Sequence, residues 1–372
     1  MHRLLITGGA GFIGSNFVRY WFDRHPDDHI FVLDALTYAG NVSNLSGLMG
    51  DRCSFVHGSI TDMALVTRML QDNRIDTVVH FAAESHVDRS ITGPDAFIQT
   101  NVVGTHNLLA ACRLVWLERE KRKHRFHHVS TDEVYGSLGP DDPAFLEDTS
   151  YAPNSPYSAS KAAADHLVRA YHHTYGLTTT ISNCSNNYGP YHFPEKLIPL
   201  TIVNLLTGKK IPVYGQGLNV RDWLHVVDHC AAIDVILQKG SPGETYNIGA
   251  NCERNNLQIV EAICDIIDSE FAANPEFGER FPSAISASRK PSRSAITFVA
   301  DRLGHDFRYA IDAGKLKRKL GFSCSVTFEA GLRETVRWFL DNEQWWRNVM
   351  DGLYRDYIQQ SYGLLTNSGN DA

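Results

Sequence analysis

A tyrosine and a lysine four residues apart are the first candidates for chemistry in this sequence. Tyr157 and Lys161 follow Ser155 and Pro156, which are typical of the start of a helix, so both side chains lie on one helix face. A free tyrosine has a pKa of about 10 and is a poor base at neutral pH. A nearby ammonium group stabilises the phenolate and lowers this pKa. The pair therefore indicates a base that removes the proton of a hydroxyl group while a hydride leaves the same carbon.

Two adjacent carboxyl groups, Asp132 and Glu133, are the second candidates. They follow a predicted strand over residues 125–129, in the run Ser-Thr-Asp-Glu-Val-Tyr-Gly. A capped surface loop is the alternative, because Ser, Thr and Asp are common there. In a parallel sheet, however, ligands bind beyond the carboxyl ends of the strands. Because a like charge raises one of two neighbouring pKa values, we expect one of these carboxyl groups to be protonated and the other ionised, while Thr131 shares the hydrogen bond to the reacting hydroxyl.

A glycine-rich run, Gly-Gly-Ala-Gly-Phe-Ile-Gly, connects a predicted strand over residues 3–7 to a segment with helical spacing of apolar residues. Gly8 suits a tight turn, Gly11 lets the backbone approach a pyrophosphate, and Gly14 lets helix and strand pack closely. A structural turn is the alternative for the glycines alone. The next strand, however, ends at Asp34, where a carboxylate accepts hydrogen bonds from ribose hydroxyls and repels a 2′-phosphate. We therefore expect a dinucleotide-binding unit that takes NAD, whose positive nicotinamide ring would lower the pKa of the tyrosine further.

Strands and helices alternate along the first half of the chain. The expected elements are strands 3–7, 30–33, 53–57, 77–81, 125–129 and 178–182 and helices 62–73, 95–119 and one from Pro156. This alternation predicts a Rossmann-like α/β fold with a doubly wound parallel sheet. Beyond it we expect a loop at 183–190 and a helix that begins within 193–199. Because 372 residues exceed one domain of about 150, we also expect a smaller companion domain.

The composition excludes several classes of function. Thirty-five Lys and Arg against 42 Asp and Glu give a net charge of −7 without a long basic run, which argues against binding to a nucleic acid polymer. No stretch approaches the ~20 apolar residues of a membrane-spanning helix, and the apolar run near the N-terminus is too short for a signal peptide. We therefore expect a cytoplasmic protein with no membrane partner.

The cysteines and histidines suggest neither a disulfide framework nor a metal site. The seven cysteines are odd in number, scattered and without a Cys-x-x-Cys motif, so we expect reduced thiols. The seventeen histidines are an unusual count and include the pairs His127-His128 and His172-His173. Adjacent residues of a strand point to opposite faces, and no metal-ligand spacing occurs. We expect no metal, and the sequence offers no chemical reason for the histidine count.

Together these motifs resemble those of the extended short-chain dehydrogenases/reductases, and within them the dTDP-D-glucose 4,6-dehydratase family. The resemblance runs from residue 3 to about residue 360. Its most specific segments are 82–93, 130–136, 157–161, 183–199 and 221–223. A related sugar epimerase would keep the glycines, Tyr157 and Lys161 but would lack the Asp132-Glu133 pair. A sugar-nucleotide decarboxylase would match the glutamate but not the aspartate.

The resemblance implies a hydro-lyase reaction without net redox change. Tyr157 deprotonates the hydroxyl at carbon 4 of the glucose ring with a hydride passing to NAD, Glu133 removes the proton at carbon 5, and Asp132 protonates the departing hydroxyl at carbon 6. The hydride then returns to carbon 6 and carbon 5 is protonated again, which gives dTDP-4-keto-6-deoxy-glucose for the biosynthesis of rhamnose or another deoxysugar. The implied catalytic residues are Thr131, Asp132, Glu133, Tyr157 and Lys161. A UDP-sugar 4,6-dehydratase, a sugar-nucleotide 4-epimerase and a catalytically silent NAD-binding sensor are the alternatives.

The resemblance also implies two sets of binding residues. Those for NAD are Gly8, Gly11, Phe12, Ile13, Gly14, Asp34, Ala35, Leu36, Thr37, Ser59, Ile60, Phe81, Ala82, Ala83, Ser85, Thr100, Tyr157, Lys161 and Asn187. Those for the dTDP-glucose substrate are Ser85, Thr131, Asp132, Glu133, Asn186, Lys196, Leu197, Pro212, Val213, Tyr214, Arg221, Asn256, Asp301, Arg302, His305 and Tyr309. The cations among them suit a diphosphate, because a guanidinium group binds phosphate oxygens as a fork.

The resemblance also implies an organisation into subunits and into domains, with a smaller C-terminal α/β substrate-binding domain. The NAD-binding domain would span residues 1–190 with returning segments near 222–248, the sugar-nucleotide-binding domain mainly 191–221 and 249–365, and a frayed tail 366–372. The long helices at 95–119 and 158–175 would pair with their equivalents in a second copy as a four-helix homodimer interface. Packing of these helices on their own sheet is the alternative.

Three departures from the family pattern are visible. Ser59 stands where the family usually has an aspartate that holds the adenine amino group, so we expect that contact to be weaker or replaced by water. Leu303 replaces a usual proline. Residues 271–294 form an enlarged polar insertion, which we expect to be a surface loop.

Overall fold

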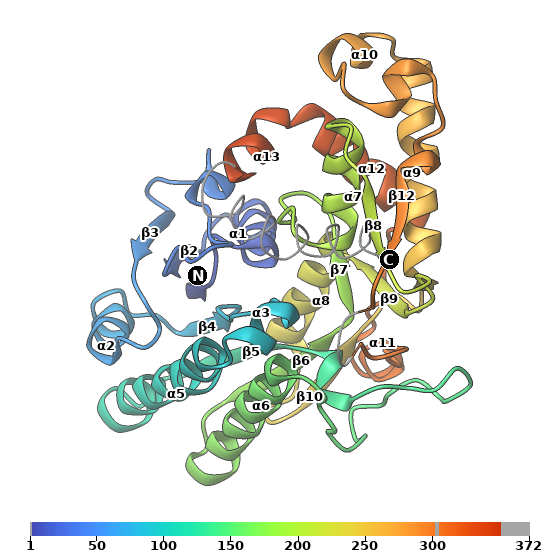
Figure 1. Ribbon diagram of the computed structural model, residues 1–372. Coiled ribbons are helices and arrows are strands. Elements are labelled where there is room, and N and C mark those ends of the chain that lie inside the picture. Colours follow the sequence, from blue (N-terminus) through green and yellow to red (C-terminus); the bar gives the residue numbers. More distant parts are fainter. Residues whose placement is uncertain (1, 302–304, 351–372) are drawn as a thin grey trace.

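Seven strands form one parallel sheet at the centre of the molecule (Figure 1). The computed structural model describes residues 2–301 and 305–350, and within them the sheet has the order β10-β6-β5-β4-β1-β2-β3. Its strands are β1 (Arg3–Thr7), β2 (His29–Asp34), β3 (Cys53–His57), β4 (Thr77–His80), β5 (Arg125–Thr131), β6 (Thr179–Cys184) and β10 (Thr245–Ile248). All neighbouring pairs run parallel, which confirms the predicted Rossmann-like α/β fold.

The sheet grows in two directions from β1. The chain first proceeds outward through β2 to β3, and it then returns to add β4, β5 and β6 on the other side of β1. The connections that leave β1 and β4 therefore diverge, which opens a crevice beyond their carboxyl ends. In doubly wound sheets this is the place where ligands bind.

Helices cover both faces of the sheet, and each face has its own hydrophobic core. On one face α2 (Met63–Asp72), α5 (Thr105–Cys112) and α6 (Pro156–Tyr175) pack over a cluster that includes Leu5. On the other face α1 (Phe12–Arg24) and α8 (Val226–Lys239) pack over a cluster that includes Leu4 and Ile6. Successive residues of β1 thus enter opposite cores, as the two-residue period of a strand buried on both faces requires.

Helix α6 is fixed at both ends by local sequence. The hydroxyl of Ser155 accepts a hydrogen bond from the backbone N–H of Ser158, and the hydroxyl of Ser158 accepts one from the N–H of Ser155. Pro156 occupies the first turn, and Gly176 ends the helix with a φ of 75°. The predicted start at Pro156 is confirmed.

The long helix predicted at 95–119 is continuous but irregular. It begins after α3 (Val87–Thr92) with α4 (Asp95–Phe97) and includes α5. A π-helical segment, Ile98–Gly104, connects α4 to α5, and a second one, Arg113–Arg119, follows. In Figure 1 α5 and α6 lie side by side along one face of the molecule.

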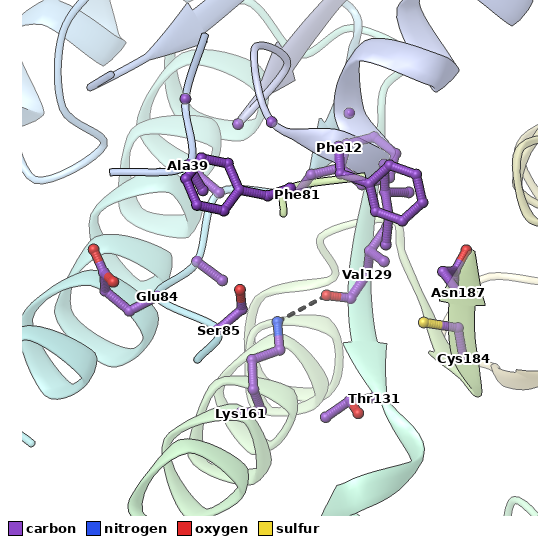
Figure 2. Close-up of a pocket in the computed structure, with 18 of the residues that line it drawn as sticks. Phe12, Ala39, Phe81, Glu84, Ser85, Val129, Thr131, Lys161, Cys184 and Asn187 are labelled. Carbon is purple, nitrogen blue, oxygen red and sulfur yellow. Dashed lines mark hydrogen bonds between the residues drawn. The ribbon is translucent and has the colours of Figure 1, made fainter. Parts of the chain in front are cut away.

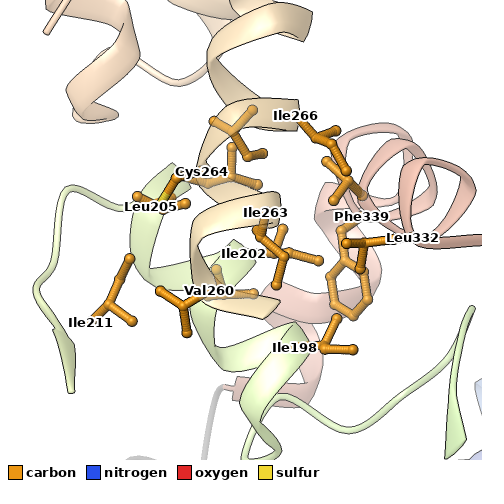
Figure 3. Close-up of a cluster of buried hydrophobic side chains, with 14 of the residues drawn as sticks. Ile198, Ile202, Leu205, Ile211, Val260, Ile263, Cys264, Ile266, Leu332 and Phe339 are labelled. Carbon is orange, nitrogen blue, oxygen red and sulfur yellow. The ribbon is translucent and has the colours of Figure 1, made fainter. Parts of the chain in front are cut away.

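A third hydrophobic core lies in the C-terminal part of the chain, where side chains of α7, α9 and α12 meet (Figure 3). The helices of this part are α7 (Leu197–Leu206), α9 (Asn256–Ala273), α10 (Glu276–Arg280), α11 (Gly314–Leu320), α12 (Phe328–Asp341) and α13 (Glu343–Met350). Its strands are β8 (Ile211–Tyr214), paired with β12 (Ile296–Val299), and β9 (Val220–His225), which lies between β7 (Asn186–Tyr188) and β11 (Glu253–Asn255). A separate core fits a second, smaller unit, and the predicted domain boundaries stay a prediction.

The loop expected at 183–190 is partly wrong. Asn183 and Cys184 belong to β6, because they pair with Ser130 and Thr131 at the end of β5. The segment Asn186–Tyr188 forms β7, because it pairs with β9. The helix expected within 193–199 begins at Leu197.

The insertion at 271–294 is not a surface loop, so this expectation is wrong. Phe271, Phe277 and Phe281 are buried, and each ring contacts the other two. The carboxylate of Asp268 on α9 accepts hydrogen bonds from two serines of the insertion. The polar average composition of the segment concealed three phenylalanines that belong to the third core.

Some expectations concern residues that the structure does not describe. Arg302, Leu303 and the tail at 366–372 lie outside the described residues, so what the sequence predicts for them stays a prediction. Over 2–301 and 305–350, no helix combines the length and apolar character needed to cross a membrane.

Several of the many histidines are core residues. Both ring nitrogens of His80 lie within hydrogen-bond distance of threonine hydroxyls on β1 and α5, at 2.8 and 2.9 Å. Those of His127 lie 3.0 and 3.1 Å from the hydroxyls of Thr180 and Ser182 on β6. Burial holds the pKa of both imidazoles well below the usual range, so they are neutral. Among the described residues, no group of three or more His, Cys, Asp or Glu side chains is placed to hold a metal ion.

Candidate active site

A cavity of about 430 Å³ lies at the carboxyl ends of β1, β2, β4, β5 and β6, where the sheet changes its direction of growth. Its walls come from the glycine-rich loop, the ends of these strands, helix α6 and the segment that precedes α7. Figure 2 shows side chains from these elements around the cavity, with Lys161 of α6 facing the end of β5. We call this the central cavity.

The glycine-rich loop is built so that side chains are excluded at two of its positions. A Cβ atom on Gly8, whose φ is +69°, would lie 2.6 Å from the backbone nitrogen of Ala82, and one on Gly14 would lie 2.2 Å from the carbonyl oxygen of Gly8. Gly11 caps α1 without any side chain that could accept from the first-turn amides. A bare helix N-terminus of this kind fits a pyrophosphate group.

Asp34 lies at the end of β2 and lines the central cavity. Its Oδ2 accepts a hydrogen bond from the N–H of Ala10 at 2.9 Å, and its Oδ1 accepts one from the N–H of Leu36 at 2.8 Å. The carboxylate therefore holds the glycine-rich loop while it faces the cavity. All residues predicted to bind NAD line the cavity except Leu36, which contacts Asp34 through its backbone.

The five predicted catalytic residues line the same cavity. Thr131, Asp132 and Glu133 come from the end of β5, whereas Tyr157 and Lys161 come from α6. The two elements are in contact, and the ammonium group of Lys161 donates a 2.8 Å hydrogen bond to the carbonyl oxygen of Val129 (Figure 2). The structure thus brings together two motifs that lie far apart in the sequence, 131–133 and 157–161. Their catalytic roles stay a prediction.

The surroundings of Asp132 raise its pKa, whereas the ionised state expected for Glu133 stays a prediction. Asp132 is buried, and burial, together with the neighbouring Glu133 and Asp222, raises its pKa well above the usual range. Its Oδ2 atom has no hydrogen-bond partner among the described residues. These causes favour the neutral form of Asp132, and its role as the acid stays a prediction.

The pKa of Tyr157 differs from the expectation. Burial first, and then the carboxylate of Glu133, raises the pKa of Tyr157 well above its usual value. Burial also lowers the pKa of Lys161, which the carboxylate of Asp165 partly offsets. The protein's own groups therefore do not supply the reduction that was expected from the lysine.

Besides Thr131, Asp132 and Glu133, four residues predicted for the substrate line the cavity: Ser85, Asn186, Lys196 and Leu197. The ammonium group of Lys196 donates to the carbonyl oxygen of Ser85 at 3.3 Å. The neighbouring Asn187 lines the cavity too, and its side-chain oxygen lies 2.8 Å from Nδ1 of a buried histidine on α8.

The other predicted substrate residues do not line the central cavity. These are Pro212, Val213, Tyr214, Arg221, Asn256, Asp301, His305 and Tyr309. Val213 packs in the third core. The guanidinium group of Arg221 lies over the ring of Tyr309 at 4.3 Å, and its charge acts on Asp132. Arg221 thus influences the carboxyl pair although it does not line the cavity. Substrate contact by these eight residues stays a prediction.

Several cavity residues were not predicted from the sequence. They include Glu84, Cys184, Ser185, His192, Phe193, Glu195 and Trp223. Glu195 is buried, which raises its pKa to about 7, and its Oε2 lies 3.8 Å from Nε2 of His86 and 4.0 Å from Nε of Arg89. The sequence signal for Glu195 and His192 was present, because both lie in the segment 183–199 that carries part of the resemblance.

Comparison with known proteins identifies the family. The model of the family described as GDP-mannose 4,6 dehydratase matches residues 5–335. A dTDP-glucose 4,6-dehydratase of Salmonella typhimurium is 53% identical over 372 aligned residues, which cover 97% of this chain and 99% of the relative. One of Xanthomonas campestris is 56% identical over 359 residues, covering 95% and 98%. The chain belongs to the dTDP-glucose 4,6-dehydratase family.

Solved structures of this family share the fold. DesIV, a dTDP-glucose 4,6-dehydratase of Streptomyces venezuelae solved with NAD and TYD bound, has a TM-score of 0.82 and 46% identity over 93% of this chain and 99% of its own. A dTDP-glucose 4,6-dehydratase of Bacillus anthracis in complex with NAD has a TM-score of 0.80 and 44% identity, covering 94% and 100%. A UDP-glucose 4-epimerase of Thermotoga maritima is more distant, with a TM-score of 0.76 and 26% identity over 92% and 99%.

Proposed function

We propose that this protein dehydrates dTDP-glucose to dTDP-4-keto-6-deoxy-glucose and uses NAD as a bound cofactor. The observation that carries the proposal is the Asp132-Glu133 pair, which lies in one cavity with Tyr157 and Lys161. An oxidation alone needs only the tyrosine and the lysine, whereas loss of water also needs an acid and a base. The close relatives named for this reaction support the same function.

The residues present fit NAD. The bare start of α1 at Gly11 and the close packing at Gly8 and Gly14 leave room for a pyrophosphate, and Asp34 faces the place of the adenosine ribose. When bound, NAD supplies a hydride acceptor for carbon 4 and a hydride donor for carbon 6. Two family members were solved with NAD bound, which supports the assignment.

Tyr157 acts in the first step as the base for the hydroxyl at carbon 4. Its own surroundings raise its pKa, so the phenolate forms only with help from positive charge next to it. Lys161, held by Val129, is the cation that the chain itself supplies. Thr131 shares the hydrogen bond to the same hydroxyl.

Asp132 and Glu133 act in the elimination. Once carbon 4 is a ketone, the proton at carbon 5 becomes acidic, and Glu133 removes it. Asp132, kept protonated by burial and by Glu133, gives its proton to the departing hydroxyl at carbon 6. Opposite protonation states on adjacent carboxyl groups are what this step requires.

The nucleotide end of the substrate would lie toward Lys196 and Arg221. Lys196 lines the cavity, and the guanidinium group of Arg221 lies over the ring of Tyr309 while its charge lowers the pKa of Asp132. A diphosphate between the two cations would have its charge balanced in an otherwise anionic protein. The preference for dTDP over UDP is part of this proposal, and a UDP-sugar 4,6-dehydratase or 4-epimerase is not favoured by the relatives.

We further propose a cytoplasmic homodimer. All seven cysteines are free, which suits a reducing compartment. The helices α5 and α6 would form the shared interface, and Ile91 and Ile98 near them expose large apolar side chains. Light scattering of the purified protein would test this, because a dimer has about twice the mass of the chain.

The proposed activity can be tested by incubating the purified protein with dTDP-glucose without added NAD. The proposal expects a 4-keto product, detected by its absorbance in base, and hydrogen from solvent at carbon 5. Parallel reactions with UDP-glucose and GDP-mannose measure the nucleotide preference. Absence of product from every substrate, in protein shown to contain NAD, would contradict the dehydratase assignment.

A further inference from the structure

Asp165 is a buried carboxyl group that the proposed chemistry does not use. It lies one helical turn beyond Lys161 on α6, so Tyr157, Lys161 and Asp165 follow one another at intervals of four residues along one face. Its side chain is 2% exposed, and it does not line the central cavity. A buried carboxyl group costs free energy unless it is paired and hydrogen-bonded, so its partners indicate why it is there.

The neighbours of the Asp165 carboxylate belong to elements that support the catalytic residues. Its Oδ2 accepts hydrogen bonds from the hydroxyl of Ser130 at 2.8 Å and from that of Tyr151 at 2.9 Å. Its Oδ1 lies 3.2 Å from Nε2 of His128. The hydroxyl of Tyr151 in turn accepts from the amide of Asn183 at 3.1 Å. Asp165 thereby connects α6 to β5, to β6 and to the segment before α6.

The contact with Ser130 lies next to the contact of Lys161. The ammonium group of Lys161 donates to the carbonyl oxygen of Val129, and Asp165 accepts from the side chain of the following residue. The catalytic run Thr131–Glu133 begins directly after these two residues. Two bonds from successive turns of α6 therefore fix the end of β5 from which the carboxyl pair extends.

Asp165 is also the anion that acts on Lys161. Burial lowers the pKa of Lys161 and the charge of Asp165 raises it, while burial raises the pKa of Asp165 to about 6 and Lys161 lowers it. Burial holds the pKa of His128 well below its usual range, so this neighbour is neutral. The other titratable groups that face Asp165 are Tyr151 and Tyr135, and His166 on the same helix.

We propose that Asp165 is a positioning residue that acts through Lys161 and through the end of β5. Its carboxylate is the fixed countercharge that keeps the lysine protonated, and its bond to Ser130 fixes the distance between α6 and the carboxyl pair. The inference rests on the proposed function, in which a charged Lys161 assists Tyr157.

Three variants separate charge from packing. Asp165→Asn keeps the shape and removes the charge. Tyr151→Phe keeps the charge and removes one hydrogen bond to it. Asp228→Asn is the matched control, because Asp228 is 2% exposed on α8 and accepts hydrogen bonds from Ser325 and Val326, away from the central cavity.

The measurements are kcat and KM for dTDP-glucose from about pH 5 to about pH 10, the absorbance of bound NADH after mixing with substrate, and the NAD content of each variant. For Asp165→Asn we expect kcat to fall at least about tenfold with little change in KM. The alkaline limb of the kcat profile should move to lower pH by about one unit, because Lys161 loses its proton more easily without the neighbouring carboxylate. Bound NADH should form more slowly and follow the same shift.

For Tyr151→Phe we expect the acidic limb to move to higher pH, because the hydrogen bond from Tyr151 lowers the pKa of Asp165. Asp228→Asn should leave both limbs in place. A folded, NAD-containing Asp165→Asn variant with an unchanged profile and kcat would overturn the inference. If that variant does not fold, an unmoved acidic limb in Tyr151→Phe overturns it instead. Absence of product from the unmodified protein would refute the proposed function itself, which is a different result.

Discussion

Replacing Asp132 by Asn tests the division of labour within the carboxyl pair. The side chain is 1% exposed, its Oδ1 lies 3.4 Å from the hydroxyl of Thr131, and its Oδ2 has no partner among the described residues. Burial and Glu133 hold its pKa well above the usual range, which favours the neutral form of the native side chain. Asn replaces one neutral group by another of the same shape. We therefore expect the free energy of unfolding to change by no more than about 1 kcal/mol.

The effect on catalysis should be large and confined to one step. A positioned general acid contributes ~10²–10⁴-fold, which corresponds to about 3–5 kcal/mol of activation free energy. Oxidation at carbon 4 depends on Tyr157 and Lys161, which the substitution leaves in place. The variant should therefore oxidise the substrate at the normal rate and then lose water slowly, so that bound NADH accumulates.

Rapid mixing with dTDP-glucose, followed by the absorbance of bound NADH and by product formation, distinguishes the two steps. Asp148→Asn, an exposed carboxyl group outside the cavity, is the control and should match the unmodified protein. A normal rate of dehydration in Asp132→Asn, without accumulation of NADH, would refute the assignment of Asp132 as the acid.

Three further perturbations address the base, the cofactor loop and a buried acid. Tyr157→Phe keeps the ring and removes the base, so no bound NADH should form on mixing and kcat should fall ~10²–10⁴-fold; a normal NADH signal would exclude this role. Gly14→Ala would place a Cβ 2.2 Å from the carbonyl oxygen of Gly8, so we expect the variant to lose copurifying NAD and about 1–3 kcal/mol of unfolding free energy. The control Gly278→Ala, whose Cβ would have no atom within 4 Å, should keep its NAD and its stability. Glu195 has its pKa raised from 4.5 to about 7, so its favourable contribution to stability is present below about pH 4.5 and is lost as the pH rises through 7. Between about pH 4 and about pH 8 the unfolding free energy of the unmodified protein should therefore fall by up to about 3 kcal/mol relative to that of Glu195→Gln. Denaturation at a series of pH values measures both, and the same pH dependence in the two proteins would contradict this.

Local patterns were sufficient to predict the cofactor half of the site. The glycine spacing, the strand that ends at Asp34 and the cap at Ser155 each depend on residues near one another in sequence, and the structure agrees with all of them. The parallel direction of the strands also follows from alternation, because parallel strands need helical crossovers, whereas their order does not. The residues at strand ends could therefore be placed at one edge of the sheet from the sequence alone.

Features that depend on distant packing could not be predicted. Glu195 and Asp222 are buried by elements far apart in the sequence, and nothing near them signals that burial would raise their pKa. The insertion was misjudged because composition averages over a segment, whereas the burial of Phe277 depends on its facing α9. The raised pKa of Tyr157 likewise reflects the depth of the site rather than the spacing of the motif.

In the proposed reaction, one cavity oxidises carbon 4, removes water and returns the same hydride to carbon 6. dTDP-glucose carrying deuterium at carbon 4 tests it most directly, with the product examined by NMR after reaction in ordinary water. We predict that the deuterium is found in the methyl group at carbon 6 and that carbon 5 carries hydrogen from the solvent. Deuterium that remains at carbon 4, or is lost to the solvent, would contradict the claim.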